Sequence, residues 1–233
     1  MGTGWRRCRR WLANCSLRGL AAWALAALAL STAVFGAGAA GAATPAAAPK
    51  RVLIVGDSLS AEYGLARGSG WVALLDARLQ REKVPATVVN ASISGDTTSG
   101  GLTRLPALLS THKPDIVVLE LGGNDALRGL PLAQTQSNLT AMARAAKAGG
   151  ARVLVVGMQV PPNYGRQYGA DFSALFATVA KTEGAALVPF LLAGVADAPN
   201  ADALFQADRI HPKAEAHPRI LDNVWPVLRP LLK

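Results

Sequence analysis

The feature that most constrains this chain is the apolar run from Val52 to Val55, which breaks abruptly into Gly56-Asp57-Ser58. A mostly β-branched run of this kind is typical of a parallel strand that is buried on both faces. Such a strand delivers the residues after it to the carboxyl edge of the sheet, where open α/β folds bind their ligands. We therefore expect Ser58 to lie at a ligand-binding edge. The alternative is that Ser58 only caps a following helix.

Strands and helices alternate along the rest of the chain. Apolar runs predict strands at 52–55, 86–90, 116–121, 153–156 and 186–188. Helical periodicity predicts helices at 70–83, 102–109, 132–148, 171–183 and 213–232, the last of which Pro218 and Pro226 must start, kink or shorten. Strict alternation with short connections predicts an α/β fold, a three-layer αβα sandwich around a five-stranded parallel sheet. Two long loops, 159–169 and 191–206, are expected to be functional.

The first 43 residues have the order of a secretory signal peptide. Five arginines and no acidic residue come first, then a mostly apolar run from Leu20 to Phe35, then small residues. The apolar run is short for a membrane span, and an uncleaved N-terminal anchor is the alternative. We expect a signal peptide at 1–43, a Pro/Ala spacer at 44–50 and one domain at 51–233. The mature protein would then be periplasmic or secreted, with no stable membrane span after cleavage.

Charge and cysteine content exclude several classes of function. Without the five leader arginines, the 24 basic residues become 19 against 15 acidic residues, so the net charge is +4 rather than +9. The basic residues do not cluster, so nothing favours nucleic-acid binding. Both cysteines, Cys8 and Cys15, lie in the leader, which leaves the domain without a thiol nucleophile, a disulfide or a thiolate metal site. We expect no metal and no cofactor; the oligomeric state stays open, and a monomer is compatible with the sequence.

Polar residues follow each of the first three predicted strands, and another set lies near the C-terminus. Parallel strands bring such residues to one edge of the sheet. A serine nucleophile needs a base, and a histidine base needs a partner that fixes its tautomer. Asp208 and His211 are three residues apart, so one tight turn brings the carboxylate to Nδ1 and leaves Nε2 facing Ser58. The stretches concerned are Gly56-Asp57-Ser58, Asn90 to Thr97, Gly122-Gly123-Asn124-Asp125 and Asp208 to Pro212.

These stretches resemble, in order, the four blocks of the GDSL/SGNH hydrolases, whose fold is flavodoxin-like. The blocks are Gly56-Asp57-Ser58-Leu59-Ser60, Gly95, Gly123-Asn124-Asp125 and Asp208-x-x-His211. The chain is most similar to the branch of bacterial periplasmic thioesterase I/lysophospholipase enzymes, also called arylesterases, because it shares the stretches 89–97, 119–125 and 162–166. The resemblance covers essentially all of the predicted domain.

The resemblance implies a role for each block. Ser58 would be the nucleophile, His211 the base and Asp208 its orienting acid. The oxyanion would be bound by the backbone amides of Ser58 and Gly95 and by the side chain of Asn124. One departure is Arg209, where this branch usually has glycine, which adds bulk and charge beside the triad.

The implied function is a secreted serine hydrolase that acts on small acyl esters, thioesters or lysolipids through an acyl-enzyme. The alternatives are an acyltransferase or short-chain acetylesterase on the same fold, or a catalytically silent lipid- or sugar-binding domain. Apolar residues after the third block and in the loop 159–169 are expected to line an acyl groove, although they could simply cover the sheet edge. The proposed substrate-binding residues are Leu127, Leu130, Pro131 and Tyr164.

Other polar residues of these stretches are assigned structural roles. We interpret Asp57, Asp96 and Asp125 as carboxylates that brace the loops, because a side chain adjacent to Ser58 is poorly placed to orient a distant histidine. His217, six residues after His211, is expected to lie at the surface.

Overall fold

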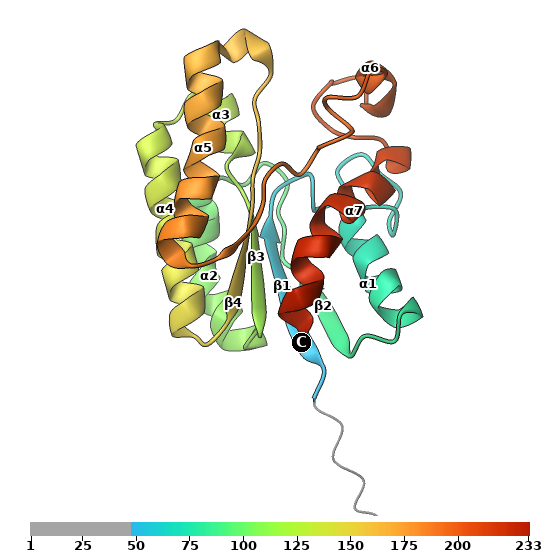
Figure 1. The fold of residues 1–233 in the computed structure, drawn as a ribbon, viewed down its shortest axis with the longest axis vertical. Coiled ribbons are helices and arrows are strands. Elements are labelled where there is room, and N and C mark those ends of the chain that lie inside the picture. The colour runs from blue at the N-terminus through green and yellow to red at the C-terminus, as the bar shows by residue number, and fades with distance from the viewer. Residues whose placement is uncertain (1–47) are drawn as a thin grey trace, which may run out of the picture. The chain divides into compact units, whose positions relative to one another are not determined.

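The computed structural model describes residues 48–233, which lie within one compact unit (Figure 1). The predicted signal peptide and residues 44–47 of the spacer fall outside the described residues. A five-stranded parallel sheet with the order β2-β1-β3-β4-β5 runs through the centre. The strands are β1 (Lys50–Gly56), β2 (Ala86–Asn90), β3 (Ile116–Glu120), β4 (Arg152–Val156) and β5 (Ala186–Val188).

Helices cover both faces of the sheet. The longer ones are α1 (Trp71–Arg81), α2 (Thr98–His112), α4 (Leu132–Ala148), α5 (Arg166–Glu183) and α7 (His217–Leu228). The short ones are α3 (Gly123–Leu127) and α6 (Ala201–Leu204), with 3-10 turns η1 (Pro162–Tyr164), η2 (Ala214–Ala216) and η3 (Arg229–Leu232). In Figure 1, α1 and α7 lie on one side of the sheet, and α2, α4 and α5 lie on the other.

Each face of β1 packs into its own hydrophobic core, as expected of a strand buried on both faces. Val52 and Ile54 belong to the core under α1 and α7, which includes Trp71 and Trp225. Leu53 and Val55 belong to the core under α2, α4 and α5. All four side chains are fully buried. The predicted three-layer fold with a five-stranded parallel sheet is confirmed.

Several helix boundaries differ from the prediction. The second helix begins at Thr98 rather than 102, because the side chain of Thr97 accepts a hydrogen bond from the Gly100 amide and caps it. Helix α5 begins at Arg166, whereas the corresponding helix was predicted to begin at 171, so the predicted loop 159–169 is wrong in its second half. The loop 191–206 contains α6, and α3 was not predicted at all.

The C-terminal segment is one helix in the prediction but three pieces in the structure. Residue 213 lies outside the helices, Pro218 lies in the first turn of α7, and the chain tightens into η3 after residue 228. The expected surface position of His217 is wrong. Its side chain is 1% exposed, and its Nδ1 accepts a hydrogen bond of 3.0 Å from the backbone N–H of Trp71, which starts α1. His217 therefore joins the first turns of α1 and α7.

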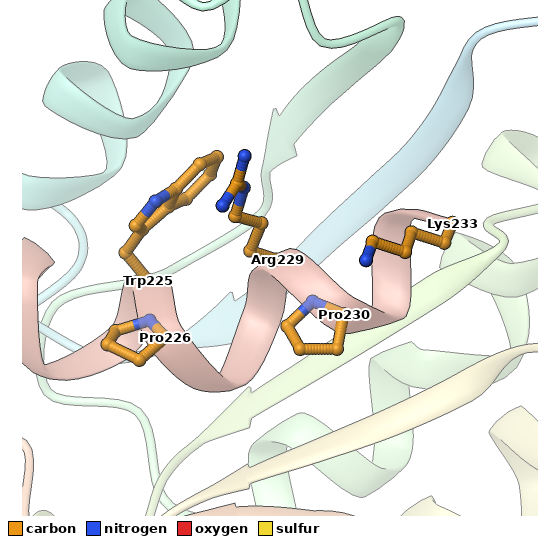
Figure 2. A pocket seen from close by; sticks show the side chains of 5 residues that line it. All are labelled: Trp225, Pro226, Arg229, Pro230 and Lys233. Carbon is orange, nitrogen blue, oxygen red and sulfur yellow. The ribbon is translucent and has the colours of Figure 1, made fainter.

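A hollow near the C-terminus lies away from the residues of the four blocks. It is lined by Trp225, Pro226, Arg229, Pro230 and Lys233 (Figure 2). The backbone oxygen of Lys233 accepts a hydrogen bond of 3.0 Å from Arg152, at the start of β4, which places this hollow toward the amino ends of the strands. Across residues 48–233, none of the helices combines the length and the apolar character needed to cross a membrane.

Candidate active site

The four sequence blocks meet at the carboxyl edge of the sheet. The strand order reverses at β1, with β2 on one side and β3 on the other, and such a switch point is where doubly wound folds bind ligands. Ser58 follows β1 and Asn124 follows β3. Ser58 does not cap a helix, because turns follow it and α1 begins only at Trp71.

Ser58, His211 and Asp208 form a continuous hydrogen-bonded chain. The Ser58 Oγ lies 2.8 Å from His211 Nε2, and His211 Nδ1 lies 2.7 Å from Asp208 Oδ2. The other oxygen of Asp208 accepts hydrogen bonds from the backbone N–H groups of Ile210 and His211, at 2.9 and 3.0 Å. This tight turn fixes the carboxylate against the imidazole, so Nε2 is positioned to take a proton from Ser58.

The turn that holds Asp208 requires an unusual backbone conformation at the next residue. Arg209 has a φ of 58°, in the left-handed region that glycine adopts most readily. This explains why glycine is common at this position in the family branch that the sequence resembles. The imidazole itself is covered by Tyr63, whose ring centroid lies 4.3 Å from that of His211.

Two backbone N–H groups at this edge are available to bind an oxyanion. Within residues 48–233, neither the amide of Ser58 nor that of Gly95 donates a hydrogen bond. Gly95 has a φ of 79°, a backbone conformation that glycine adopts readily because it has no side chain. Free, fixed donors of this kind are what a tetrahedral oxyanion needs.

The Asn124 side chain contacts the residues next to Ser58 and Gly95 in the chain, so its Nδ2 already has two acceptors. It donates to Asp57 Oδ2 at 3.1 Å and to the backbone oxygen of Asp96 at 2.9 Å. Because both neighbours are acceptors, the nitrogen and oxygen of the amide are unambiguously assigned. If Asn124 binds an oxyanion, one of its N–H groups must be shared with Asp57 or Asp96, or released from it.

The three aspartates brace the loops, as the sequence analysis predicts. Asp57 accepts from the Leu59 amide as well as from Asn124. Asp96 pairs with Arg104 at 2.8 Å, and Asp125 accepts from the amide of Thr98 at 2.9 Å. All three therefore tie one block to another or to α2.

A buried carboxylic acid, Glu120, lies under the nucleophile loop. Its Oε2 accepts hydrogen bonds from Ser60 Oγ at 2.5 Å and from the Asp57 amide at 3.3 Å. Burial, and then the negative charge of Asp57, raise the pKa of Glu120 well above its usual 4.5. Burial likewise raises the pKa of Asp57 to about 6. The sequence analysis did not predict that Glu120 and Asp57 interact.

This pair predicts a particular dependence of stability on pH. An unfolded chain loses the Glu120 proton near pH 4.5, whereas the folded protein keeps it, so the folded state becomes less stable as the pH rises above that value. We expect Glu120→Gln, which does not titrate, to lose less stability than the unchanged protein between pH 5 and pH 8. Urea unfolding of both proteins at several pH values measures this, and parallel curves would contradict it.

Several large apolar side chains stay exposed at the carboxyl edge of the sheet. Among the described residues, they lie on loops, on turns or at the end of the short helix α3. They follow β1, β2 and β3 or belong to the turn that carries His211. They are Tyr63, Ile93, Leu127, Leu130 and Ile210, with exposures from 37% to 54%. We call these five residues the apolar rim.

The predicted substrate-binding residues belong only in part to this rim. Leu127 and Leu130 are exposed as expected, although Leu127 ends the helix α3 rather than lying in a loop. Pro131 is exposed and precedes α4. Tyr164 stacks on Tyr168 at 6.1 Å, so its ring is held against α5. The sequence analysis did not single out Tyr63, Ile93 or Ile210, although Ile93 lies in the polar stretch from Asn90 to Thr97 and Ile210 lies in the fourth block.

The sequence is similar to a known protein family and to individual proteins. The GDSL-like Lipase/Acylhydrolase family matches residues 54–219. "Esterase TesA" of Pseudomonas aeruginosa is 56% identical over 189 residues, which is 81% of this chain and 92% of the relative. "Thioesterase 1/protease 1/lysophospholipase L1" of Escherichia coli (strain K12) is 44% identical over 187 residues, which is 80% of this chain and 87% of the relative.

A solved structure agrees with these sequence relatives. The crystal structure of TesA superposes with a TM-score of 0.75 at 55% identity, and the match covers 78% of this chain and 99% of that one. The family match at residues 54–219 spans all four blocks.

Proposed function

The chain belongs to the GDSL-like lipase/acylhydrolase family, and we propose that it hydrolyses acyl esters and thioesters through an acyl-enzyme on Ser58. The observation that carries the proposal is the hydrogen-bonded chain from Asp208 through His211 to Ser58. This hydrogen-bonded arrangement serves proton transfer from a nucleophile, which a catalytically silent binding domain does not need.

The proposed reaction begins when Ser58 Oγ attacks the acyl carbon and its proton passes to His211 Nε2. The carbonyl electrons move to the oxygen, and the resulting oxyanion is bound by the free amides of Ser58 and Gly95. As the carbonyl re-forms, the leaving alcohol or thiol takes the proton from His211. A water molecule then attacks the acyl-enzyme in the same way, which releases the carboxylic acid and restores Ser58.

Purified protein tests this proposal with two matched substrates. An octanoyl nitrophenyl ester and an octanoyl thioester present the same acyl group with different leaving groups. We expect both to be hydrolysed, and we expect a short burst of nitrophenol if breakdown of the acyl-enzyme limits the rate. Absence of hydrolysis for both substrates would contradict the proposed function.

The apolar rim supports acyl groups as the substrate class. A single exposed apolar side chain is common on protein surfaces, but several at the same edge of the sheet indicate a contact surface. Leu127 and Leu130 lie just after the third block, Ile93 lies two residues before Gly95, and Ile210 lies in the fourth block. We propose that the hydrocarbon chain of the substrate lies across this rim.

This placement predicts how activity depends on acyl chain length. Each methylene that becomes buried contributes about 0.8 kcal/mol, roughly a fourfold gain in kcat/KM. We expect kcat/KM to rise over several methylenes from acetyl to medium-chain esters and then level off. Leu127→Ala combined with Leu130→Ala should lower the octanoyl-to-acetyl ratio of kcat/KM.

Leu231→Ala is the matched control, because Leu231 is half-buried in η3, near the C-terminal hollow. A protein whose kcat/KM is highest for acetyl esters and falls with each added carbon would contradict the acyl-binding role of the rim. The acetylesterase alternative would then be preferred.

We also propose that the protein is exported to the periplasm or secreted. The leader of arginines, an apolar run and small residues supports this. N-terminal sequencing of the exported protein should give a first residue between 40 and 44. Recovery of Met1 from washed membranes would instead support an uncleaved anchor.

A further inference from the structure

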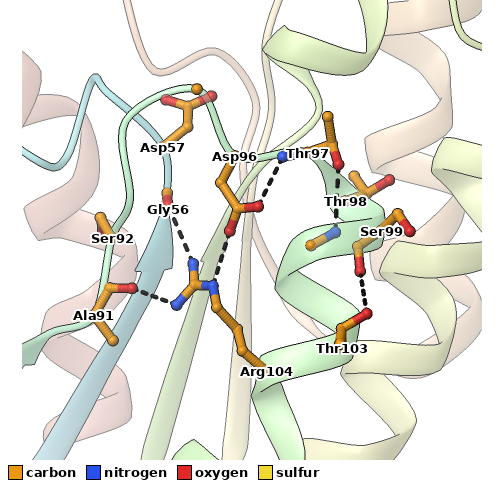
Figure 3. A network of polar contacts seen from close by, with 12 residues as sticks. Gly56, Asp57, Ala91, Ser92, Asp96, Thr97, Thr98, Ser99, Thr103 and Arg104 are labelled. Atoms are coloured by element: carbon orange, nitrogen blue, oxygen red, sulfur yellow. Dashed lines mark hydrogen bonds and ion pairs between the residues drawn. The ribbon is translucent and has the colours of Figure 1, made fainter.

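Arg104, on α2, connects three parts of the backbone at the carboxyl edge of the sheet. Its Nε donates to Asp96 Oδ2 at 2.8 Å, one Nη donates to the backbone oxygen of Ala91, and the other approaches the backbone oxygen of Gly56 at 3.4 Å. Figure 3 shows the guanidinium between these three acceptors. The side chain is 19% exposed, and its hydrogen bonds within residues 48–233 go to these three residues and not to the triad.

Two of the three acceptors lie close in the chain to a predicted oxyanion donor. Gly56 is two residues before Ser58, and Asp96 directly follows Gly95. The backbone oxygen of Asp96 also accepts the hydrogen bond from Asn124 Nδ2. One guanidinium therefore fixes the segments that carry both free backbone amides and the residue that orients the third donor.

We infer that Arg104 is a positioning residue that sets the geometry of the oxyanion site without touching the substrate. This inference rests on the proposed function, because it assigns a purpose to the amides of Ser58 and Gly95. A donor displaced by about 1 Å can cost up to about 10²-fold in rate, so support of this kind has a measurable effect.

The planar shape of the guanidinium is what this role requires. Its separate N–H groups point in fixed directions and reach acceptors on two loops at once, whereas a lysine ammonium is a point charge on a flexible stem. Arg104→Lys would keep the charge opposite Asp96 but lose the simultaneous contacts with Ala91 and Gly56. A purely structural ion pair would be largely preserved by that change.

Gly100 offers an independent way to disturb the same arrangement. A Cβ placed on Gly100 would lie 1.9 Å from Asp96 Oδ1, so Gly100→Ala displaces the Asp96 carboxylate without changing Arg104 itself. If the position of Asp96 sets the oxyanion geometry, Gly100→Ala should lower activity in the same way as a change at Arg104.

The experiment compares Arg104→Gln, Arg104→Lys and Gly100→Ala with the unchanged protein. The readouts are kcat/KM for acetyl and octanoyl nitrophenyl esters, and inhibition by an octyl trifluoromethyl ketone. The hydrated or serine-bound ketone is tetrahedral, so its binding reports on the oxyanion site. Arg104→Gln should lower kcat/KM by about tenfold to about a hundredfold, by the same factor for both esters, and should raise the inhibition constant in parallel.

The matched control is Arg144→Gln. Arg144 Nε donates to Glu183 at 2.9 Å, in an ion pair between α4 and α5 away from the four blocks. The control should keep kcat/KM and the inhibition constant within threefold. We expect Arg104→Lys to retain the thermal midpoint better than Arg104→Gln but to recover little activity.

Three outcomes would overturn the inference. They are a folded Arg104→Gln protein with kcat/KM within threefold of the unchanged protein, a loss of kcat/KM without a matching rise in the inhibition constant, and a Gly100→Ala protein with full activity. Failure of the proposed function would look different, because the unchanged protein would then hydrolyse neither ester.

Discussion

Replacing Ser58 by alanine is expected to lower kcat for ester hydrolysis by at least about 10⁴-fold. The hydroxyl is the group that His211 Nε2 contacts at 2.8 Å, and without it the oxyanion donors and the apolar rim have no nucleophile to assist. The fold should be unaffected, because Ser58 lies at the partly exposed edge of the sheet and its side chain bonds only to His211 among the described residues. Steady-state kinetics and thermal unfolding measure both effects.

Ser60→Ala is the matched control for this experiment, since it changes a serine in the same motif. Ser60 Oγ bonds to buried Glu120 at 2.5 Å and accepts from Trp71 Nε1 at 3.1 Å. Its loss leaves buried groups without partners, which costs about 1–3 kcal/mol of stability. We expect Ser60→Ala to unfold at a lower temperature yet to retain kcat within tenfold. A Ser58→Ala protein with activity close to that of the unchanged protein would rule out the acyl-enzyme proposed above.

Asp208→Asn should produce the second large effect, a loss of about 10⁴-fold in kcat. The asparagine oxygen would accept from the Ile210 and His211 amides, as Oδ1 of Asp208 does. Its NH₂ group would then face His211 Nδ1 and force the imidazole proton onto Nε2. In that tautomer His211 has no lone pair with which to accept the proton of Ser58.

Asp202→Asn is a suitable control, because Asp202 is an exposed acid on the nearby helix α6. It should retain full activity. An Asp208→Asn protein that loses less than tenfold would show that the carboxylate does not set the tautomer of His211.

The charge of Asp208 persists far into the acidic range. Burial opposes its ionisation, but hydrogen bonds from the His211 and Ile210 amides and from the His211 ring outweigh burial and lower its pKa to about 2. An unfolded aspartate titrates near 3.8, so the stability that these bonds contribute is present above that value and is lost as the pH falls toward 2. If activity falls as the pH is lowered toward 4, protonation of Asp208 is therefore not the cause.

The fold could be predicted because its strands and longest helices have strong local patterns. The strand Ala86–Asn90 and the helix Leu132–Ala148 were predicted with the bounds that the structure shows, since apolar spacing and the Gly149-Gly150 stop signal define them. The helix α3 was missed because its five residues are too few for a periodic pattern.

Contacts between distant segments account for what sequence reasoning missed at the site. His217 was expected at the surface because nothing local reveals that Trp71, 146 residues earlier, donates to its ring. Arg104 lies in a helix whose pattern gives no sign that its side chain reaches the backbone of β1 and of the loop after β2. The two acceptors that occupy Asn124 likewise come from separate segments, one after β1 and one after β2.

The central claim, that Ser58 is the nucleophile of a hydrolase, is tested most directly by covalent labelling. An alkyl fluorophosphonate reacts when a serine oxygen attacks phosphorus and fluoride leaves, with the proton passing to the base. Peptide mass spectrometry then locates the added phosphonyl group. We predict a single label on Ser58, absent from Ser58→Ala and slower to form in Asp208→Asn. A label on another residue, or an unlabelled protein that hydrolyses esters at its full rate, would contradict the claim.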